Sequence, residues 1–336
     1  MKRSITFLMI LMLMTGMVMT GCGKEMPKKD PNQLQIVATD FAPYDFAKRV
    51  AGDAAQVTML LSPGEEAHSF EPTPREIIQI QECDVFVYTG GESEEWVTDI
   101  LEDLGSDITA VKLMDCVELF EEETVEGMES DGHGHSHDEE ECEEEGHDHE
   151  HEDEHDHGEG AEYDEHVWTA PANAILITEY LSDVFAQADP EQKEAYEANE
   201  ASYVKELEKL DQAFWKVVKE GKRKTLIFGD RFPMRYFVEE YGLAYYAAFP
   251  GCASDTEPSA KTVAFLIDKV RDEHIPVVFH VELSNQSMVN TICEDTGAKK
   301  CQINACHNIS KEQFEAGVGY LELMWHNVEV LKEALN

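Results

Sequence analysis

Histidine is the residue type whose placement in this chain most directly suggests chemistry. Eight of the fourteen histidines lie in one acidic tract, "DGHGHSHDEEECEEEGHDHEHEDEHDHGEG", at residues 131–160. Imidazole suits zinc, copper and nickel, but a tract without fixed geometry should bind several ions weakly and interchangeably. The segment 127–162 has no periodic apolar residues to offset its ordering entropy, so we predict a disordered insert. The tract histidines are His133, His135, His137, His147, His149, His151, His155 and His157.

Three isolated histidines stand in more specific surroundings. His68 lies in "SPGEEAHSFEPTPREI", His166 in "YDEHVWTAPANA" and His307 in "INACHNIS". His68 and His307 each follow a strand-like run, and ligands of open α/β sheets collect at the carboxyl ends of strands. From the pattern alone, each of the three is either a metal ligand or a capped or core histidine.

Short β-rich runs alternate with helical stretches along the rest of the chain. The first four are "QLQIVAT", "QVTML", "CDVFVYTG" and "DITAVKL", and the last four are "KTLIFGD", "AYYAAF", "IPVVFHVE" and "AKKCQI". This order predicts an α/β fold with two lobes, each a four-stranded, mainly parallel sheet flanked by helices.

A long helix is predicted between the lobes. Asp189 suits its N-cap and Pro190 its first turn, and thirty residues would reach about 45 Å. We expect this single rigid helix to join the lobes and to limit their motion on ligand binding. Its apolar stripe consists of Tyr196, Tyr203, Leu207, Leu210, Phe214 and Val217.

The N-terminus has the pattern of a signal peptide for export. Lys2 and Arg3 precede an apolar run too short to be a good membrane span, and Thr20-Gly21-Cys22 resembles a bacterial lipobox. The resemblance implies cleavage before Cys22 and lipidation of that cysteine. We therefore expect an extracytoplasmic protein that is anchored by lipid to the bacterial cell membrane.

Charge and cysteine content narrow the function further. The formal net charge is −44, so the chain lacks the basic surface that nucleic-acid binding requires. Its negative electrostatic potential suits a metal ion or another cation better. Without Cys22, seven cysteines remain, of which Cys252 could pair with Cys301 or Cys306.

Several segments together resemble the zinc and manganese ABC-importer solute-binding family. They are "GEEAHSFEPTPREI", "ECDVFVYTGGESEEW", "DEHVWTAPANA", "DPEQKEAYEANEASYVKELEKLD", "RYFVEEYGL" and "EPSAK". The likeness covers nearly all of the chain after the leader, and family members often carry a His- and acid-rich insert at this place. The resemblance implies a binding protein, expected to be monomeric, that delivers its metal to an ABC permease and its ATPase.

The resemblance also implies a ligand set. His68 and His166 match family ligands, while the third family position falls in "FGDRFPMRYFVEEYGL", which has no histidine, so Asp230 is a tentative ligand there. His307 lies near the fourth position, and Glu282 in "HVELSN" is a weaker candidate. Three imidazoles favour Zn²⁺, whereas two imidazoles with two carboxylates would suit Mn²⁺ better.

Other functions remain open at this point. A manganese-specific member of the family, a surface zinc buffer or adhesin in which the tract matters most, and a zinc hydrolase are the alternatives. The hydrolase would need a general base beside an open metal position. GxSxG does not occur, and the one HExxH match, at residues 151–155, lies in the acidic tract, where we predict no helix to hold its two histidines on one face. The expected organisation is a leader 1–22, a tether 23–33, an N-terminal lobe 34–188 with the insert 127–162, an interlobe helix 189–222 and a C-terminal lobe 223–336.

Overall fold

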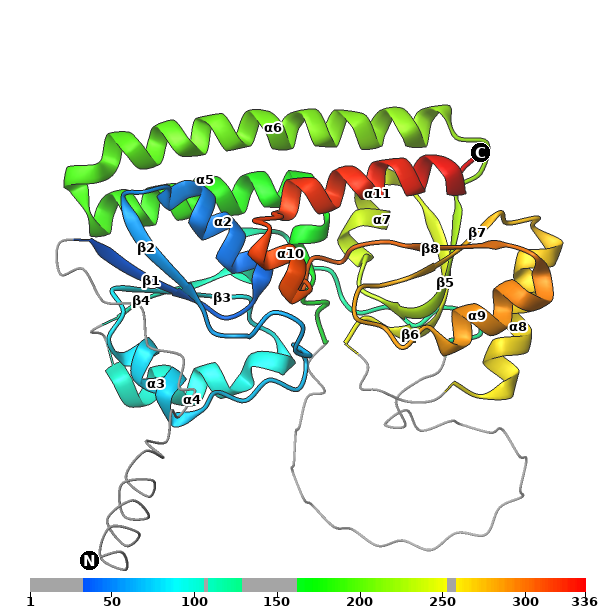
Figure 1. The fold of residues 1–336 in the computed structure, drawn as a ribbon, viewed down its shortest axis with the longest axis horizontal. Coiled ribbons are helices and arrows are strands. Elements are labelled where there is room, and N and C mark those ends of the chain that lie inside the picture. The colour runs from blue at the N-terminus through cyan, green and yellow to red at the C-terminus, as the bar shows by residue number, and fades with distance from the viewer. Residues whose placement is uncertain (1–32, 106–107, 129–161, 253–257) are drawn as a thin grey trace, which may run out of the picture. The chain divides into compact units, whose positions relative to one another are not determined.

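Two four-stranded parallel sheets form the centre of the computed structural model (Figure 1), which describes residues 33–105, 108–128, 162–252 and 258–336. All eight predicted strands are confirmed. The first sheet holds β1 (Leu34–Ala38), β2 (Ala55–Met59), β3 (Val85–Tyr88) and β4 (Thr109–Lys112). The second holds β5 (Thr225–Phe232), β6 (Ala244–Pro250), β7 (Val277–His280) and β8 (Lys299–Gln302).

The two sheets have the same relative strand order. The orders are β2-β1-β3-β4 and β6-β5-β7-β8, and every pair within them is parallel. The strand order therefore reverses between β1 and β3, and again between β5 and β7. Crevices at the carboxyl ends of strands beside such reversals are where ligands bind in open α/β sheets.

Helices follow most strands and cover the sheets. α3 (Pro74–Gln81) starts with a capping box, in which the Thr73 hydroxyl accepts from the Glu76 amide while the Glu76 carboxylate accepts from the Thr73 amide. Pro74 occupies its first turn, where a missing N–H costs nothing, so the loop that carries His68 ends at a fixed point. Other helices are α2 (Phe41–Ala51), α4 (Glu95–Leu104), α5 (Pro171–Ala188), α7 (Arg235–Tyr241), α8 (Ala260–Asp272), α9 (Ser287–Thr296), α10 (Lys311–Glu315) and α11 (Tyr320–Ala334).

The long helix α6 (Lys193–Glu220) runs past both sheets (Figure 1) and buries the whole predicted stripe. Its start differs from the prediction: Pro190–Gln192 form a 3-10 turn, and the α-helix begins at Lys193. Asp189 caps no amide with its side chain, because its carboxylate instead accepts a hydrogen bond from the Tyr196 hydroxyl at 3.3 Å.

Residues from both sheets belong to one apolar core. That core includes Phe46 beside the first sheet, Phe228 in the second and Leu210 in α6. α6 contacts α2 and α5 as well as α7, so the two sheets are packed onto a common element. Within the described residues, no helix is long and apolar enough to cross a membrane.

Some predictions fall on parts of the chain outside the described residues. These are the leader with Cys22, the tether before Gln33, the tract histidines and most of the predicted insert. The insert's base is described: Glu121 and Tyr163 form an antiparallel bridge, and the Glu122 amide donates to the Glu162 carbonyl at 2.8 Å. Cys252, Cys301 and Cys306 are free thiols, so the suggested pairing of Cys252 is not formed.

Candidate metal centre

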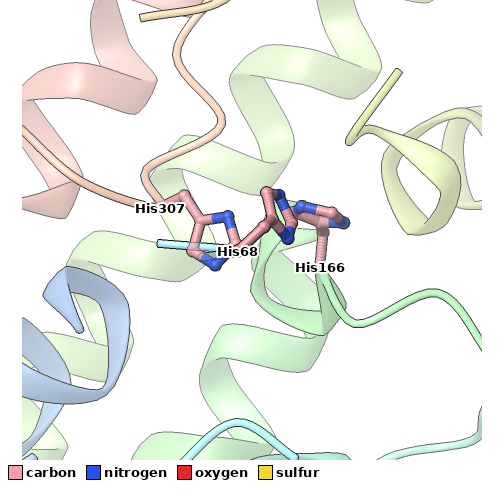
Figure 2. A group of neighbouring side chains, drawn as sticks. All are labelled: His68, His166 and His307. Carbon is pink, nitrogen blue, oxygen red and sulfur yellow. The ribbon is translucent and has the colours of Figure 1, made fainter. Parts of the chain in front are cut away.

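The three isolated histidines meet between the two sheets (Figure 2). His68 comes from the loop between β2 and α3, His166 from the start of a 3-10 turn (Val167–Thr169) before α5, and His307 from the loop after β8. Ring centroids lie 4.6 Å apart for His68 and His307, 5.0 Å for His166 and His307, and 5.5 Å for His68 and His166. One nitrogen from each ring lies within 4.8 Å of the others, which is the arrangement of a metal-binding triad.

His166 presents a defined nitrogen to the centre. Its Nδ1 lies 3.1 Å from Asp164 Oδ1, and its backbone amide donates to the same oxygen at 2.8 Å. Its Nε2 is buried without a hydrogen-bond partner. Burial lowers the pKa of His166, but the Asp164 carboxylate outweighs it and raises that pKa. A carboxylate behind a histidine fixes its tautomer and raises its basicity toward a metal.

The other two rings are held neutral. Burial, with the neighbouring histidines and Arg231, holds the pKa of His68 well below its usual value. Burial and His166 lower the pKa of His307 to about 3. His68 Nδ1 is also buried and has no hydrogen-bond partner. His307 Nε2 lies 3.4 Å from Asp40 Oδ2. Neutral imidazoles are the form that binds a metal, and a bound ion would satisfy the unpartnered nitrogens of His68 and His166.

The loop that carries His307 is fixed by buried polar contacts. Both Glu282 oxygens accept from backbone amides, from Ala305 at 2.7 Å and from His307 at 3.1 Å. Asn308 donates to the carbonyls of Ser62 and Glu65 at 3.0 and 2.7 Å, which ties this loop to the loop of His68. The predicted weaker ligand Glu282 is thus placed where it holds the backbone of a histidine loop.

The Trp168 indole joins the His166 turn to the same loop. Its N–H donates to the Ala305 carbonyl at 2.7 Å, and the Tyr320 hydroxyl donates to the Trp168 carbonyl at 2.8 Å. Trp168 is fully buried. Hydrogen bonds within the core therefore connect all three histidine segments to one another.

Asp230, the tentative fourth ligand, has a different neighbourhood. Its Oδ1 accepts from the Arg231 amide at 2.9 Å, and its Oδ2 accepts from the Val281 amide at 3.1 Å. Its carboxylate thereby links the end of β5 to the residue after β7. Among the described residues, the donor groups close enough to share an ion do not include Asp230.

A small cavity of about 30 Å³ opens beside the triad, and all three histidines line it. Its rim carries an ion pair between the two halves of the fold, in which both Arg231 guanidinium nitrogens lie 3.3 Å from Glu66 carboxylate oxygens. This space suits an ion with at most a water, rather than an organic ligand of ordinary size.

Comparison with known proteins decides the family. The family described as zinc-uptake complex component A, periplasmic (ZnuA), matches residues 36–334. The chain belongs to this family. The resemblance to this solute-binding family drawn from the sequence is confirmed.

Relatives and solved structures of ZnuA type agree with that assignment. The chain is 30% identical over 330 residues to the zinc-binding lipoprotein AdcA of Streptococcus pneumoniae strain R6, covering 97% of this chain and 60% of AdcA. It is 29% identical over 327 residues to the high-affinity zinc uptake system protein ZnuA of Bacillus subtilis, covering 95% and 94%. It thus spans about three fifths of AdcA but nearly all of the Bacillus protein.

A solved structure shares the fold. The Zn(II)-bound ZnuA-like domain of S. pneumoniae AdcA matches with a TM-score of 0.71 and 28% identity, over 90% of this chain and 99% of that domain.

Sequence reasoning missed the residues that support the histidines. Asp164, Asn308 and Trp168 were not singled out, although Asp164 and Trp168 lie only two residues from His166. An acid or an amide in a loop gives no signal of its own, because only the fold shows which backbone or ring atom it faces.

Proposed function

We propose that the chain captures Zn²⁺ at His68, His166 and His307 and delivers it to the permease of an ABC importer. The observation that carries this proposal is the triad itself: three imidazoles from separate loops, one buried and two half-buried, whose nitrogens converge within 4.8 Å. Three protein ligands with an open fourth position are a common zinc arrangement. Water or a further side chain would complete the shell.

Zinc is preferred over manganese because of the donors that converge. Mn²⁺ favours carboxylate oxygen and six ligands, whereas imidazole suits zinc. Among the described residues, neither the Asp230 nor the Glu282 carboxylate belongs to a group of donors that converges with these histidines. The zinc-binding relatives support the same choice.

We also propose where the protein works and with what. Relatives are named lipoproteins, which supports lipidation at Cys22 and an extracytoplasmic, membrane-anchored location. The permease, with its ATPase, is the partner that an uptake system of this family implies. The tract would act as an accessory that raises the zinc concentration near the cavity.

Titration calorimetry tests these proposals. Zinc and manganese are titrated into the chain from residue 23 onward, into a variant lacking residues 131–160, and into His166→Ala. We expect the deletion to keep one tight zinc site and lose only weak ones, while His166→Ala loses the tight site with its fold retained by circular dichroism.

Two other results would count against the proposals. Loss of tight binding in the deletion variant would move the primary site into the tract and favour a surface buffer. Tighter binding of manganese than of zinc would favour the manganese alternative. For the accessory role, uptake at limiting zinc must fall when residues 131–160 are deleted.

A further inference from the structure

A second group of metal-binding side chains lies against the triad. One donor atom each from His68, Glu165 and Cys252 lies within 4.8 Å of the other two. The group shares His68 with the triad but adds a carboxylate and a thiol. His68 Nδ1 is buried and has no hydrogen-bond partner, so this ring has capacity for an ion.

Glu165 is held in place for such a role. It is 1% exposed, one oxygen accepts from the Ser93 amide at 2.8 Å, and the other accepts from the Ser93 hydroxyl. Each carboxylate oxygen has two lone pairs, so both can still bind a cation. A Cβ on Gly91 would lie 2.4 Å from Glu165 Oε1, and its φ is +88°. A glycine is therefore required for Glu165 to fit.

Cys252 is brought to the centre by its own neighbours. A Cβ on Gly251 would lie 2.9 Å from the Phe232 carbonyl and 3.2 Å from the His166 ring, so a glycine lets this turn lie against His166. The Cys252 amide donates to Glu122 Oε1 at 3.1 Å, which fixes the backbone. The thiol forms no disulfide.

The distances suit one zinc ion with little movement. Two donors on a tetrahedral zinc lie about 3.5 Å apart, given bonds of about 2.0–2.3 Å. Donors that start within 4.8 Å need side-chain shifts of only about an ångström to reach this spacing. Thiolate is a soft ligand that selects zinc over manganese and calcium.

We propose that His68, Glu165 and Cys252 form a second zinc position beside the triad, and that the ion exchanges partners between the two without leaving His68. As the zinc–sulfur bond forms, the Cys252 thiol gives its proton to solvent. This inference rests on the proposed zinc-binding function, because the second position would hold the same zinc ion that the triad binds.

Cobalt spectroscopy tests the second position. Co²⁺ replaces zinc in tetrahedral sites, and a cobalt–thiolate bond produces an intense near-ultraviolet charge-transfer band that imidazole and carboxylate ligands lack. One equivalent of Co²⁺ is added to the reduced chain, to Cys252→Ser, and to Cys142→Ser as the matched control from the tract. We expect the band in the wild type and in the control, its loss in Cys252→Ser, and its displacement by one equivalent of zinc.

His166→Ala separates a second position from a fourth ligand of the triad. The band should persist in that variant, because the second group does not contain His166, and should disappear in His68→Ala. Loss of the band in His166→Ala would show that the second position does not exist by itself.

Two results would overturn the inference while leaving the triad proposal intact. One is tight cobalt binding by the wild type without the band, and the other is a band that Cys142→Ser removes and Cys252→Ser keeps. If the wild type bound neither zinc nor cobalt tightly, the proposed function would fail as well.

Discussion

Asp164 determines how His166 faces the cavity. Its Oδ1 lies near the His166 Nδ1 and also accepts the His166 amide, so Nε2 is the nitrogen left to meet an ion. Both residues are almost fully buried, so water does not compete for this contact. The binding strength of the centre should therefore depend on a residue that does not itself touch zinc.

We expect Asp164→Asn to lower zinc affinity by about 10- to 100-fold, the usual cost of removing a partner behind a metal-bound histidine. Competition with a zinc chelator measures the change. Glu162→Gln is the control, because it removes a charge from an exposed side chain two residues away. Equal losses in the two variants would point to net charge rather than to the orientation of His166.

A second buried carboxyl gives the protein a pH dependence. Burial, with the nearby Asp40 charge, raises the pKa of Glu94 to about 8, although the Gly90 amide donates to its Oε2 at 2.6 Å. The folded state therefore keeps a proton that the unfolded chain loses near the ordinary value of 4.5. Its contribution to stability is complete below about pH 4.5 and is lost as the pH rises through about 8.

We expect Glu94→Gln to gain stability relative to the wild type as the pH rises from 5 to 9. The gain should reach a few kcal/mol, since one pKa unit corresponds to about 1.4 kcal/mol. Urea unfolding at both pH values measures it. The exposed neighbour Glu95 provides the control variant Glu95→Gln, which should show no such gain; a gain of equal size there would refute the assignment to Glu94.

Predictability from sequence varied among the site residues for physical reasons. His68 and His307 follow β-rich runs, and parallel strands place such residues at one edge of a sheet. Asp230 could not be judged in the same way, because a loop carboxylate accepts backbone amides as readily as it binds metal. For Cys252 the sequence suggested only a disulfide, which does not form, because its position beside His166 depends on the close approach that Gly251 allows.

At the scale of elements, α6 is the helix onto which both halves of the fold pack. Its 28 residues span about 42 Å, and its apolar spacing made it predictable apart from the first turn. That turn differs because Pro190 suits a 3-10 turn as well as an α-helix, and Asp189 bonds to Tyr196 instead of to the backbone. Leu210, with no exposed surface, lies in the shared core.

We expect Leu210→Ala to lower the free energy of unfolding by about 2–5 kcal/mol through lost burial and a residual cavity. The exposed Glu208 lies two residues away, and Glu208→Ala should change stability by less than about 0.5 kcal/mol. Denaturant unfolding with an unchanged slope measures both. A small effect at Leu210 would mean that α6 is not coupled to the core.

For the whole molecule, the shared core restricts motion between the sheets. Phe228 of the second sheet and Phe46 beside the first belong to one cluster, so wide opening would expose apolar surface at about 25 cal/mol per Å². The Arg231–Glu66 pair also joins the two halves at the cavity rim. A protein with two separate lobe cores and a hinge between them could open without exposing this apolar surface.

We therefore expect zinc-free and zinc-loaded protein to give superimposable small-angle scattering curves. The variant lacking residues 131–160 is used, so that ions bound by the tract do not contribute. Wild-type protein measured in parallel shows how much the tract adds. A marked contraction of the deletion variant on zinc binding would require a hinge that the shared core does not provide.

The base of the insert makes the chain suitable for conversion into an optical sensor. The bridge between Glu121 and Tyr163 and the bond from the Asp164 amide to the Phe120 carbonyl, at 3.0 Å, close this base. A fluorescent protein could replace the tract here, because insertions succeed where the ends of a loop are close and exposed. The junction lies three residues before His166. A structural change caused by metal binding at His166 would therefore be transmitted to the fluorescent protein through a very short stretch of backbone.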